Sequence, residues 1–229
     1  MINTKKILMI VTSHSQIDAN HPTGLWLEEA AVPYLEFKSN GADVVLASVQ
    51  GGQAPIDPRS KPDQPQADQW AEVINALKAT PAIGEFSASE FDALFLPGGH
   101  GTMFDMPANQ ELQRLIREFA DADKIIAAVC HGPAALVGVA LSDNRPLVAG
   151  MRLTAFTDEE ERAVELDAYM PFLLETKLRE LGARFITQPM WSDHVEQDGN
   201  LITGQNPQSS ASIARAVIKR LATINRGGR

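Results

Sequence analysis

Short runs of apolar residues alternate along the chain with longer segments in which apolar side chains recur at helical spacing. The first run, Lys6–Thr12, is followed by the polar Ser13–Ser15, as at the C-terminal end of a buried parallel strand. Apolar positions then follow a helical period over Leu25–Glu36, and Asn40-Gly41 supplies a C-terminal cap. This order of strand and helix predicts a β–α unit.

The same alternation continues to the end of the chain. It predicts further strands at Asp43–Ser48, Ala93–Leu96, Lys124–Val129, Met151–Phe156 and Arg184–Thr187. It predicts further helices at about Ala67–Ala79, at Asn109–Ala120, at a short segment ending near Gly138, at Phe172–Leu181 and at Ile213–Ile224. Gln197–Asn200 has the composition of a hairpin turn. Alternating strands and helices predict a single-domain α/β sandwich over residues 1–229, with a mostly parallel central sheet flanked by helices.

One proline-rich segment interrupts this pattern. Four of the 14 prolines lie between Pro55 and Pro65, and Gly51-Gly52 precedes them. A coil of this length inside a compact domain is usually either functional or disordered. We therefore treat residues of about 51–66 as a loop inserted into the domain.

Composition narrows the class of protein. The 229 residues are 44% hydrophobic, and 20 Lys and Arg against 29 Asp and Glu give a net charge of −9. That charge repels phosphate backbones and anionic membranes, so neither a nucleic acid nor a membrane is an expected partner. The apolar core Ile7–Val11 is too short for a signal peptide, and the single cysteine suits a reducing compartment. We expect a cytoplasmic protein.

Three loops carry reactive side chains to one place. In parallel sheets the ligand crevice lies beyond the carboxyl ends of the strands. The loops Ser13–Gly24, Pro97–Thr102 and Cys130–Pro133 follow predicted strands and should converge there.

Cys130 is the strongest candidate for chemistry. It follows the buried run Ile125–Val129 and precedes Gly132 and a helix, which is the arrangement of a nucleophile elbow. A helix N-terminus also stabilises a thiolate. The alternative is an inert core cysteine, because free cysteine is among the most buried residue types. The position of Cys130 at a strand end favours the nucleophile.

The residues around Cys130 leave alternatives open. His131 can act as a base only if the backbone of the turn brings the two side chains together; otherwise it bonds to a neighbouring loop. The glycines of Pro97–Gly101 fit either an oxyanion hole or a simple turn. No pair of histidines has the spacing of metal ligands on a helix, so we expect no metal site.

Two groups of acids lie near the same crevice. Glu28 and Glu29 lie on a helix with many apolar neighbours, so at least one carboxyl should point inward, where a protonated form can donate to a thiolate. A solvated pair is the alternative. The acidic run Asp158–Glu161 suits a helix N-terminus, and one member could orient His131 as the third residue of a triad.

Together these residues resemble the ThiJ/PfpI superfamily, whose fold is flavodoxin-like and similar to class I glutamine amidotransferases. Within it, the chain is similar to the heat-shock chaperone branch with glutathione-independent glyoxalase III activity. The resemblance rests on four segments in order: Thr23–Glu29, Gly98–Asp105, Ala127–Pro133 and Thr154–Glu161.

The resemblance implies roles for individual residues. Cys130 would be the nucleophile, His131 its proton-transfer partner, Glu29 the acid that hydrogen-bonds the thiol and Glu161 the third triad member. Gly99, His100 and the backbone N–H of His131 would form the oxyanion hole and substrate contacts. The neighbouring acids Glu28, Glu159 and Glu160 are the alternatives to Glu29 and Glu161.

The implied activity is conversion of methylglyoxal, or another small 2-oxoaldehyde, to D-lactate through a hemithioacetal on Cys130. It needs no cofactor, and either His131 or Glu29 could move the carbon-bound proton. Deglycation of proteins or nucleotides would begin with the same thiol. The resemblance also implies a homodimer. The alternatives are a stress-response holding chaperone, a redox sensor, or a cysteine peptidase or amidase.

Overall fold

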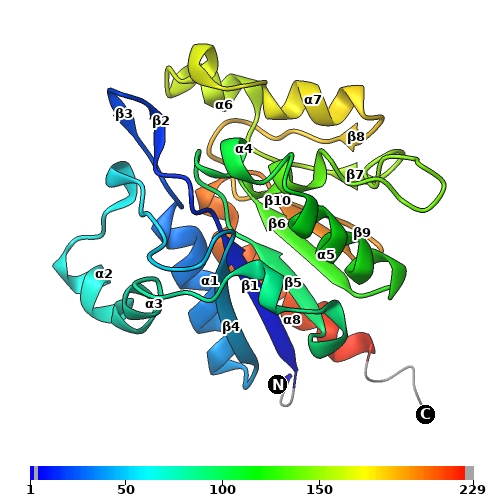
Figure 1. Cartoon of the computed structure of the whole chain (residues 1–229), viewed down its shortest axis with the longest axis horizontal. Helices are drawn as coiled ribbons and strands as arrows, with labels where there is room; N and C mark the ends of the chain where they lie inside the picture. Colours follow the sequence, from blue (N-terminus) through cyan, green and yellow to red (C-terminus); the bar gives the residue numbers. More distant parts are fainter. Residues whose placement is uncertain (3–4, 225–229) are drawn as a thin grey trace.

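A six-stranded sheet forms the centre of the computed structural model, which describes residues 1–2 and 5–224 (Figure 1). Its strands lie in the order β4-β1-β5-β6-β10-β9. Five of them are parallel, and only the edge strand β9 runs antiparallel to its neighbour. The bounds are β1 Lys6–Val11, β4 Asp43–Ser48, β5 Ala93–Leu96, β6 Ile125–Val129, β9 Val195–Asp198 and β10 Leu201–Gly204. The predicted parallel α/β sheet is confirmed.

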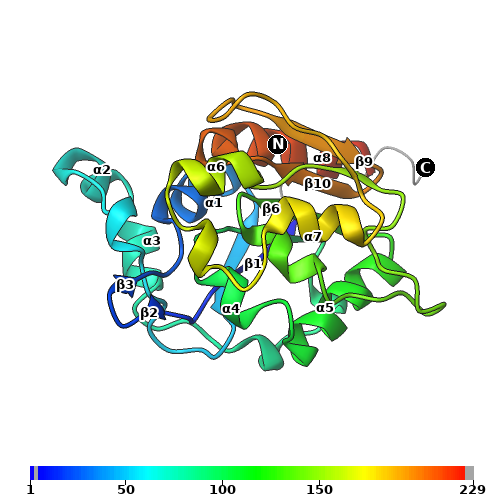
Figure 2. The same ribbon diagram turned by 90° about the horizontal axis from the view of Figure 1, so that it is seen from above.

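Helices cover both faces of this sheet (Figure 2). The side chains of β1 alternate between two cores, because successive residues of a strand point to opposite faces. Ile7 and Met9 pack with α1 (Leu27–Ser39) and α8 (Ser210–Ile224), whereas Leu8 and Ile10 pack with α5 (Gln110–Asp121). The sheet is therefore buried on both sides, which explains the continuous apolar runs of its strands.

Shorter elements lie mainly beyond the carboxyl ends of the strands, at the top of Figure 1. They include α4, α6 and α7 and the hairpin β2–β3. Their bounds are β2 Gln16–Asp18, β3 His21–Pro22, α4 Thr102–Asp105, α6 Asp158–Ala163 and α7 Leu174–Glu180. The turn predicted at Gln197–Asn200 joins β9 to β10 as a hairpin, with Gly199 at φ +61°.

Two predicted strands do not join the central sheet. Met151–Phe156 and Arg184–Thr187 shorten to β7 (Arg152–Leu153) and β8 (Arg184–Phe185), which pair in a separate two-stranded parallel sheet. The reason is topological, because both edges of β6 are already occupied by β5 and β10. An alternating pattern of strands and helices does not reveal which edges are free.

Two predicted helices also differ. The segment Ala67–Ala79 forms two short helices, α2 (Gln64–Gln69) and α3 (Ala71–Ala76). Trp70, whose ring is buried in the core, ends the first helix and begins the second. The short helix before Gly138 is a 3₁₀ helix over Gly132–Leu136.

The proline-rich segment is an ordered part of the domain. The N–H of Leu25 donates to the carbonyl of Pro55 (2.8 Å), and the N–H of Asp57 donates to the carbonyl of Leu25 (2.9 Å). Residues Pro58–Ser60 then form a 3₁₀ turn. The segment is thereby fixed against the chain that enters α1. Within the described residues, every helix is too short or too polar to cross a bilayer.

Candidate active site

A cavity of about 290 Å³ lies beyond the carboxyl ends of the strands. Two of the three predicted loops line it, through Gly99 and His100 and through Cys130 and His131. The loop Ser13–Gly24 contributes no lining residue; the wall on that side comes from Trp26 and Glu28 at the start of α1. The full lining is Trp26, Glu28, Arg59, Gly99, His100, Cys130, His131, Phe156, Val164, Trp191, Pro207 and Gln208.

Cys130 occupies a sharp turn between β6 and the 3₁₀ helix Gly132–Leu136. Its φ is +58°, a left-handed conformation that a side chain rarely adopts without a structural or functional reason. Glycine is required at position 132, because an added Cβ would lie 2.1 Å from the carbonyl oxygen of Leu96. The predicted elbow is therefore present in the backbone.

This turn brings the side chains of Cys130 and His131 together. Cys130 Sγ lies 3.3 Å from His131 Nδ1, and His131 Nε2 lies 2.6 Å from Oε2 of Glu161. All three side chains are buried. Glu161 lies on α6, the helix that follows β7 in the chain. The three groups form the line of nucleophile, base and acid that a catalytic triad requires.

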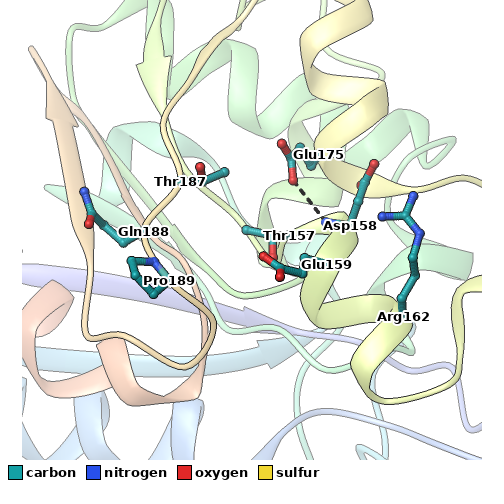
Figure 3. A pocket seen from close by; sticks show the side chains of 8 residues that line it. All are labelled: Thr157, Asp158, Glu159, Arg162, Glu175, Thr187, Gln188 and Pro189. Atoms are coloured by element: carbon teal, nitrogen blue, oxygen red, sulfur yellow. Dashed lines mark hydrogen bonds between the residues drawn. The ribbon is translucent and has the colours of Figure 1, made fainter.

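Among the neighbouring acids, only Glu161 contacts His131. Burial alone would raise the pKa of Glu161, but its contacts with His131 and His100 outweigh burial and hold the pKa well below its usual range. Glu160 points away and accepts the N–H and hydroxyl of Thr157, which begins α6. Glu159 faces a different cavity, between α6 and residues 187–189 (Figure 3).

Glu29 lies on the other side of the thiol and is fully buried. Its Oε2 accepts the N–H of Gly98 (2.7 Å), while Oε1 is buried with no hydrogen-bond partner among the described residues. Burial raises the pKa of Glu29 to about 8, although contacts with Cys130 and the Gly98 N–H act against it. At neutral pH the carboxyl is therefore protonated and can donate a hydrogen bond to sulfur. Glu28 instead lines the cavity half-buried, and burial raises its pKa too.

The resting state of Cys130 differs from the sequence-based expectation. Burial is the main cause that raises the pKa of Cys130 well above its ordinary value, and the neighbouring Glu29 adds to it. The hydrogen bond from the His131 N–H acts in the opposite direction. The helix that follows is a single 3₁₀ segment, whose dipole is too small to offset this burial. The thiol is therefore neutral at rest and must lose its proton to a neighbour when substrate binds.

Gly99 and His131, which both line the cavity, carry the backbone amides of the predicted oxyanion hole. Gly99 has a φ of +101°, and an added Cβ would lie 2.5 Å from the N atom of Trp26. Within residues 1–2 and 5–224, no backbone carbonyl accepts the N–H of Gly99 or of His131. The Gly99 N–H is thus open to an oxyanion, whereas the His131 N–H already bonds to the Cys130 sulfur at rest.

The ring of His100 does not point its nitrogens at such a site. Its Nε2 lies 2.8 Å from Oε1 of Glu161, and its Nδ1 lies 3.1 Å from Nη2 of Arg59. Its donor atom, with those of His131 and Glu161, falls within a span of 4.8 Å, so the fold creates a possible metal-binding group that spacing along the sequence did not indicate. In this structure both histidines are hydrogen-bonded to Glu161.

The sequence analysis missed three side chains that shape the cavity. Phe156 stacks near His131 at a ring separation of 4.4 Å, and Trp191 lies 5.8 Å from Phe156. Arg59 enters from the proline-rich segment. Phe156 lay inside one of the motifs already singled out, whereas Trp191 and Arg59 lie outside all four of them.

Substituting Glu29 with Gln should stabilise the folded chain at alkaline pH. The pKa of Glu29 rises from an ordinary 4.5 to about 8 on folding, so the folded state is progressively disfavoured as pH rises between these values. Relief of about 2 kcal/mol of this cost would raise Tm by about 4 °C or more at pH 8. Thermal melts from pH 5 to pH 9 should show the Tm difference between Glu29→Gln and wild type growing with pH. A difference that stays constant with pH would contradict the assignment.

The DJ-1/PfpI family model matches residues 23–220, nearly the whole chain. The chain belongs to the DJ-1/PfpI family. The match contains all four segments on which the resemblance rested, and it includes every residue of the Cys130–His131–Glu161 line.

Individual members of the family are similar over almost their full length. The glutathione-independent glyoxalase HSP31 of Saccharomyces cerevisiae is 30% identical over 228 residues, covering 92% of this chain and 95% of the yeast protein. The crystal structure of glyoxalase III from Candida albicans superposes with a TM-score of 0.86 at 28% identity, covering 94% and 97%. The Francisella tularensis Rapid Encystment Protein 24 kDa gives 0.91 at 33% identity, covering 95% and 99%. These matches confirm the predicted family and fold.

Proposed function

We propose that this protein is a glutathione-independent glyoxalase that converts methylglyoxal to D-lactate through a covalent intermediate on Cys130. The observation that carries the proposal is the buried line Cys130–His131–Glu161 at the wall of a small cavity, with the protonated Glu29 beside the sulfur. The relatives named as glyoxalases support it. A cavity of about 290 Å³ suits a small oxoaldehyde, whereas a peptidase needs an extended cleft for a chain.

The first step is activation of the thiol. His131 Nδ1, at 3.3 Å, accepts the proton of Cys130 Sγ, and the carboxylate of Glu161 stabilises the imidazolium through its hydrogen bond to Nε2. Glu29 donates to the thiolate from the opposite side. The imidazolium of His131 and the carboxyl of Glu29 thus stabilise the thiolate, which burial alone would disfavour.

The thiolate then adds to the aldehyde carbon. A carbon–sulfur bond forms, and the electron pair of the C=O bond moves to oxygen. The N–H of Gly99 receives this oxyanion, as does the N–H of His131 once the sulfur has bonded to carbon, and the oxyanion takes up a proton to give a hemithioacetal. Phe156 and Trp191 give this part of the cavity an apolar wall.

The remaining steps move one proton and add one water. Removal of the aldehyde-derived C–H proton gives an enediolate, and its return to the adjacent carbon gives a lactyl thioester. Water hydrolyses this thioester, releases lactate and restores the thiol. We assign the carbon-bound proton to Glu29, because a carboxyl with a pKa of about 8 is well matched to accept and return a proton near neutral pH once it has given up its own to the oxyanion.

Glu29→Gln separates this role from thiolate binding. The amide still accepts the Gly98 N–H and still donates to sulfur, but it cannot exchange a proton. We expect kcat to fall by about 10²-fold or more, while Cys130 remains open to alkylation by iodoacetamide. A variant that keeps more than a tenth of wild-type kcat would assign the proton to His131 instead.

Proton NMR in D₂O tests the chemical path. Wild-type protein incubated with methylglyoxal, without glutathione, should produce lactate in which deuterium has entered C2 wholly or in part, because the enediolate is reprotonated by an exchangeable group. Complete retention of the aldehyde hydrogen at C2 would indicate a hydride shift and contradict the enediolate. Absence of lactate would refute the proposed function itself.

A further inference from the structure

The proline-rich segment delivers a single charged group, Arg59, to the active-site cavity. Asp57 anchors it, since its fully buried carboxylate accepts from Nε (3.0 Å) and Nη2 (2.6 Å) of Arg59 and from the backbone N–H of the same residue (2.9 Å). The hydroxyl of Thr23 also donates to Asp57 (2.8 Å). The guanidinium is thus held in one orientation, although part of its side chain faces the cavity.

Arg59 fixes the proton positions on His100. A guanidinium has only donors, so His100 Nδ1, at 3.1 Å from Nη2, must act as the acceptor. The neutral ring then carries its hydrogen on Nε2, which donates to Oε1 of Glu161 (2.8 Å). Burial, repulsion by His131 and the charge of Arg59 lower the pKa of His100 to about 4, despite attraction to Glu161, so the ring is neutral near pH 7.

The donor and acceptor roles fixed by Arg59 at His100 continue through Glu161 and His131 to the sulfur of Cys130. Glu161 accepts from His100 through Oε1 and from His131 through Oε2, so it remains an unprotonated acceptor on both sides. His131 therefore carries its hydrogen on Nε2, and its Nδ1 is the free base that faces Cys130. The opposite tautomer of His100 would present a bare Nε2 to Glu161, and only a protonated Glu161 could bond to it.

We infer that Arg59 is a positioning residue, which acts through His100 and Glu161 to keep the basic nitrogen of His131 directed at the Cys130 thiol. The series of hydrogen bonds runs through Asp57, Arg59, His100, Glu161, His131 and Cys130. The proline-rich segment supplies its first two members. The kinetic part of this inference rests on the proposed glyoxalase reaction. The tautomer does not, because it can be observed in the free protein.

Long-range ¹H–¹⁵N NMR of ¹⁵N-histidine-labelled protein, without substrate, tests the tautomer directly. Among the five histidine rings, the signals of His100 are identified by their loss in the variant His100→Gln. In wild type, His100 should show a bare Nδ1 and a protonated Nε2. In Arg59→Met, a second tautomer should appear. Because this change leaves the buried Asp57 without its partner, Asp57→Asn/Arg59→Met is measured too and should show the same loss of a single tautomer. A protonated Nδ1 in wild type, or an unchanged tautomer in a folded variant, would overturn the inference.

Kinetics provide a second readout, which a merely structural role would not produce. Arg59→Met should lower kcat about tenfold and change KM by less than about twofold, because the base is misaligned and the cavity is retained. In a His100→Gln background the same change should cause no further loss, since its effect runs through His100. Equal losses in both backgrounds would overturn the inference. Arg145→Met is the matched control, because it removes an exposed arginine whose one ion pair within residues 1–2 and 5–224 is with Asp143. If wild type forms no lactate, the proposed function fails while the NMR result still decides the tautomer.

Discussion

Cys130→Ser is expected to abolish lactate formation while leaving the fold intact. The serine hydroxyl would occupy the same position between His131 and Glu29, but its pKa is far above that of a thiol, and His131 cannot deprotonate it to a useful extent. Removing a nucleophile typically costs at least about 10³-fold in kcat. The left-handed φ of +58° is shared by wild type and variant, because both side chains carry a Cβ, so no new backbone strain arises.

The measurement is lactate formation by equal amounts of both proteins, with Tm as the check on folding. A matched control uses wild-type protein alkylated by iodoacetamide, since Cys130 is the only cysteine in the chain. It should be as inactive as Cys130→Ser. If the folded serine variant kept even a hundredth of the activity, the covalent route would be wrong.

The second large effect is expected for Glu161→Gln. The carboxylate accepts two ring N–H groups, one through each oxygen. A glutamine has one oxygen and one NH₂ group, so one histidine ring must reverse its tautomer to avoid two facing donors. When that ring is His131, the basic nitrogen no longer faces Cys130, and kcat should fall by about 10³-fold or more. KM should change much less, because Glu161 lies behind the histidines.

Glu159→Gln is the matched control for this result. It makes the same chemical change two residues away, on the same short helix, but its side chain faces the separate cavity shown in Figure 3. Its kcat should remain within about twofold of wild type. Equal losses in the two variants would mean that the acidic run acts through the stability of α6 and not through His131.

Local chemistry explains which parts of the site could be predicted. Cys130 follows a buried apolar run and precedes a glycine, and both features act within a few residues along the chain. Glu29 lies among apolar neighbours on one helix, so its burial could also be foreseen. The position of Glu161 among three successive glutamates was assigned through the family resemblance, and the hydrogen bond to His131 now distinguishes it from Glu159 and Glu160.

Other features depend on contacts between distant segments. Arg59 reaches His100 because backbone hydrogen bonds join Leu25 to Pro55 and to Asp57. A pattern that spans a few neighbouring residues does not predict such a long-range pairing. Trp191 is held by a hydrogen bond from its backbone N–H to the carboxylate of the buried Glu160, 31 residues away. The strands β7 and β8 have an ordinary strand composition, but both sides of β6, the strand that precedes them, are occupied by β5 and β10, and they pair with each other instead.

Formation of D-lactate from methylglyoxal by the purified wild-type protein, without glutathione, tests the account most directly. The product is measured with a stereospecific D-lactate dehydrogenase, alongside Cys130→Ser as the inactive reference. The proposed covalent route through Cys130 predicts D-lactate at a steady rate with wild type and none above background with the variant. A folded wild-type protein that consumes no methylglyoxal, or that forms lactate equally well without its thiol, would contradict it.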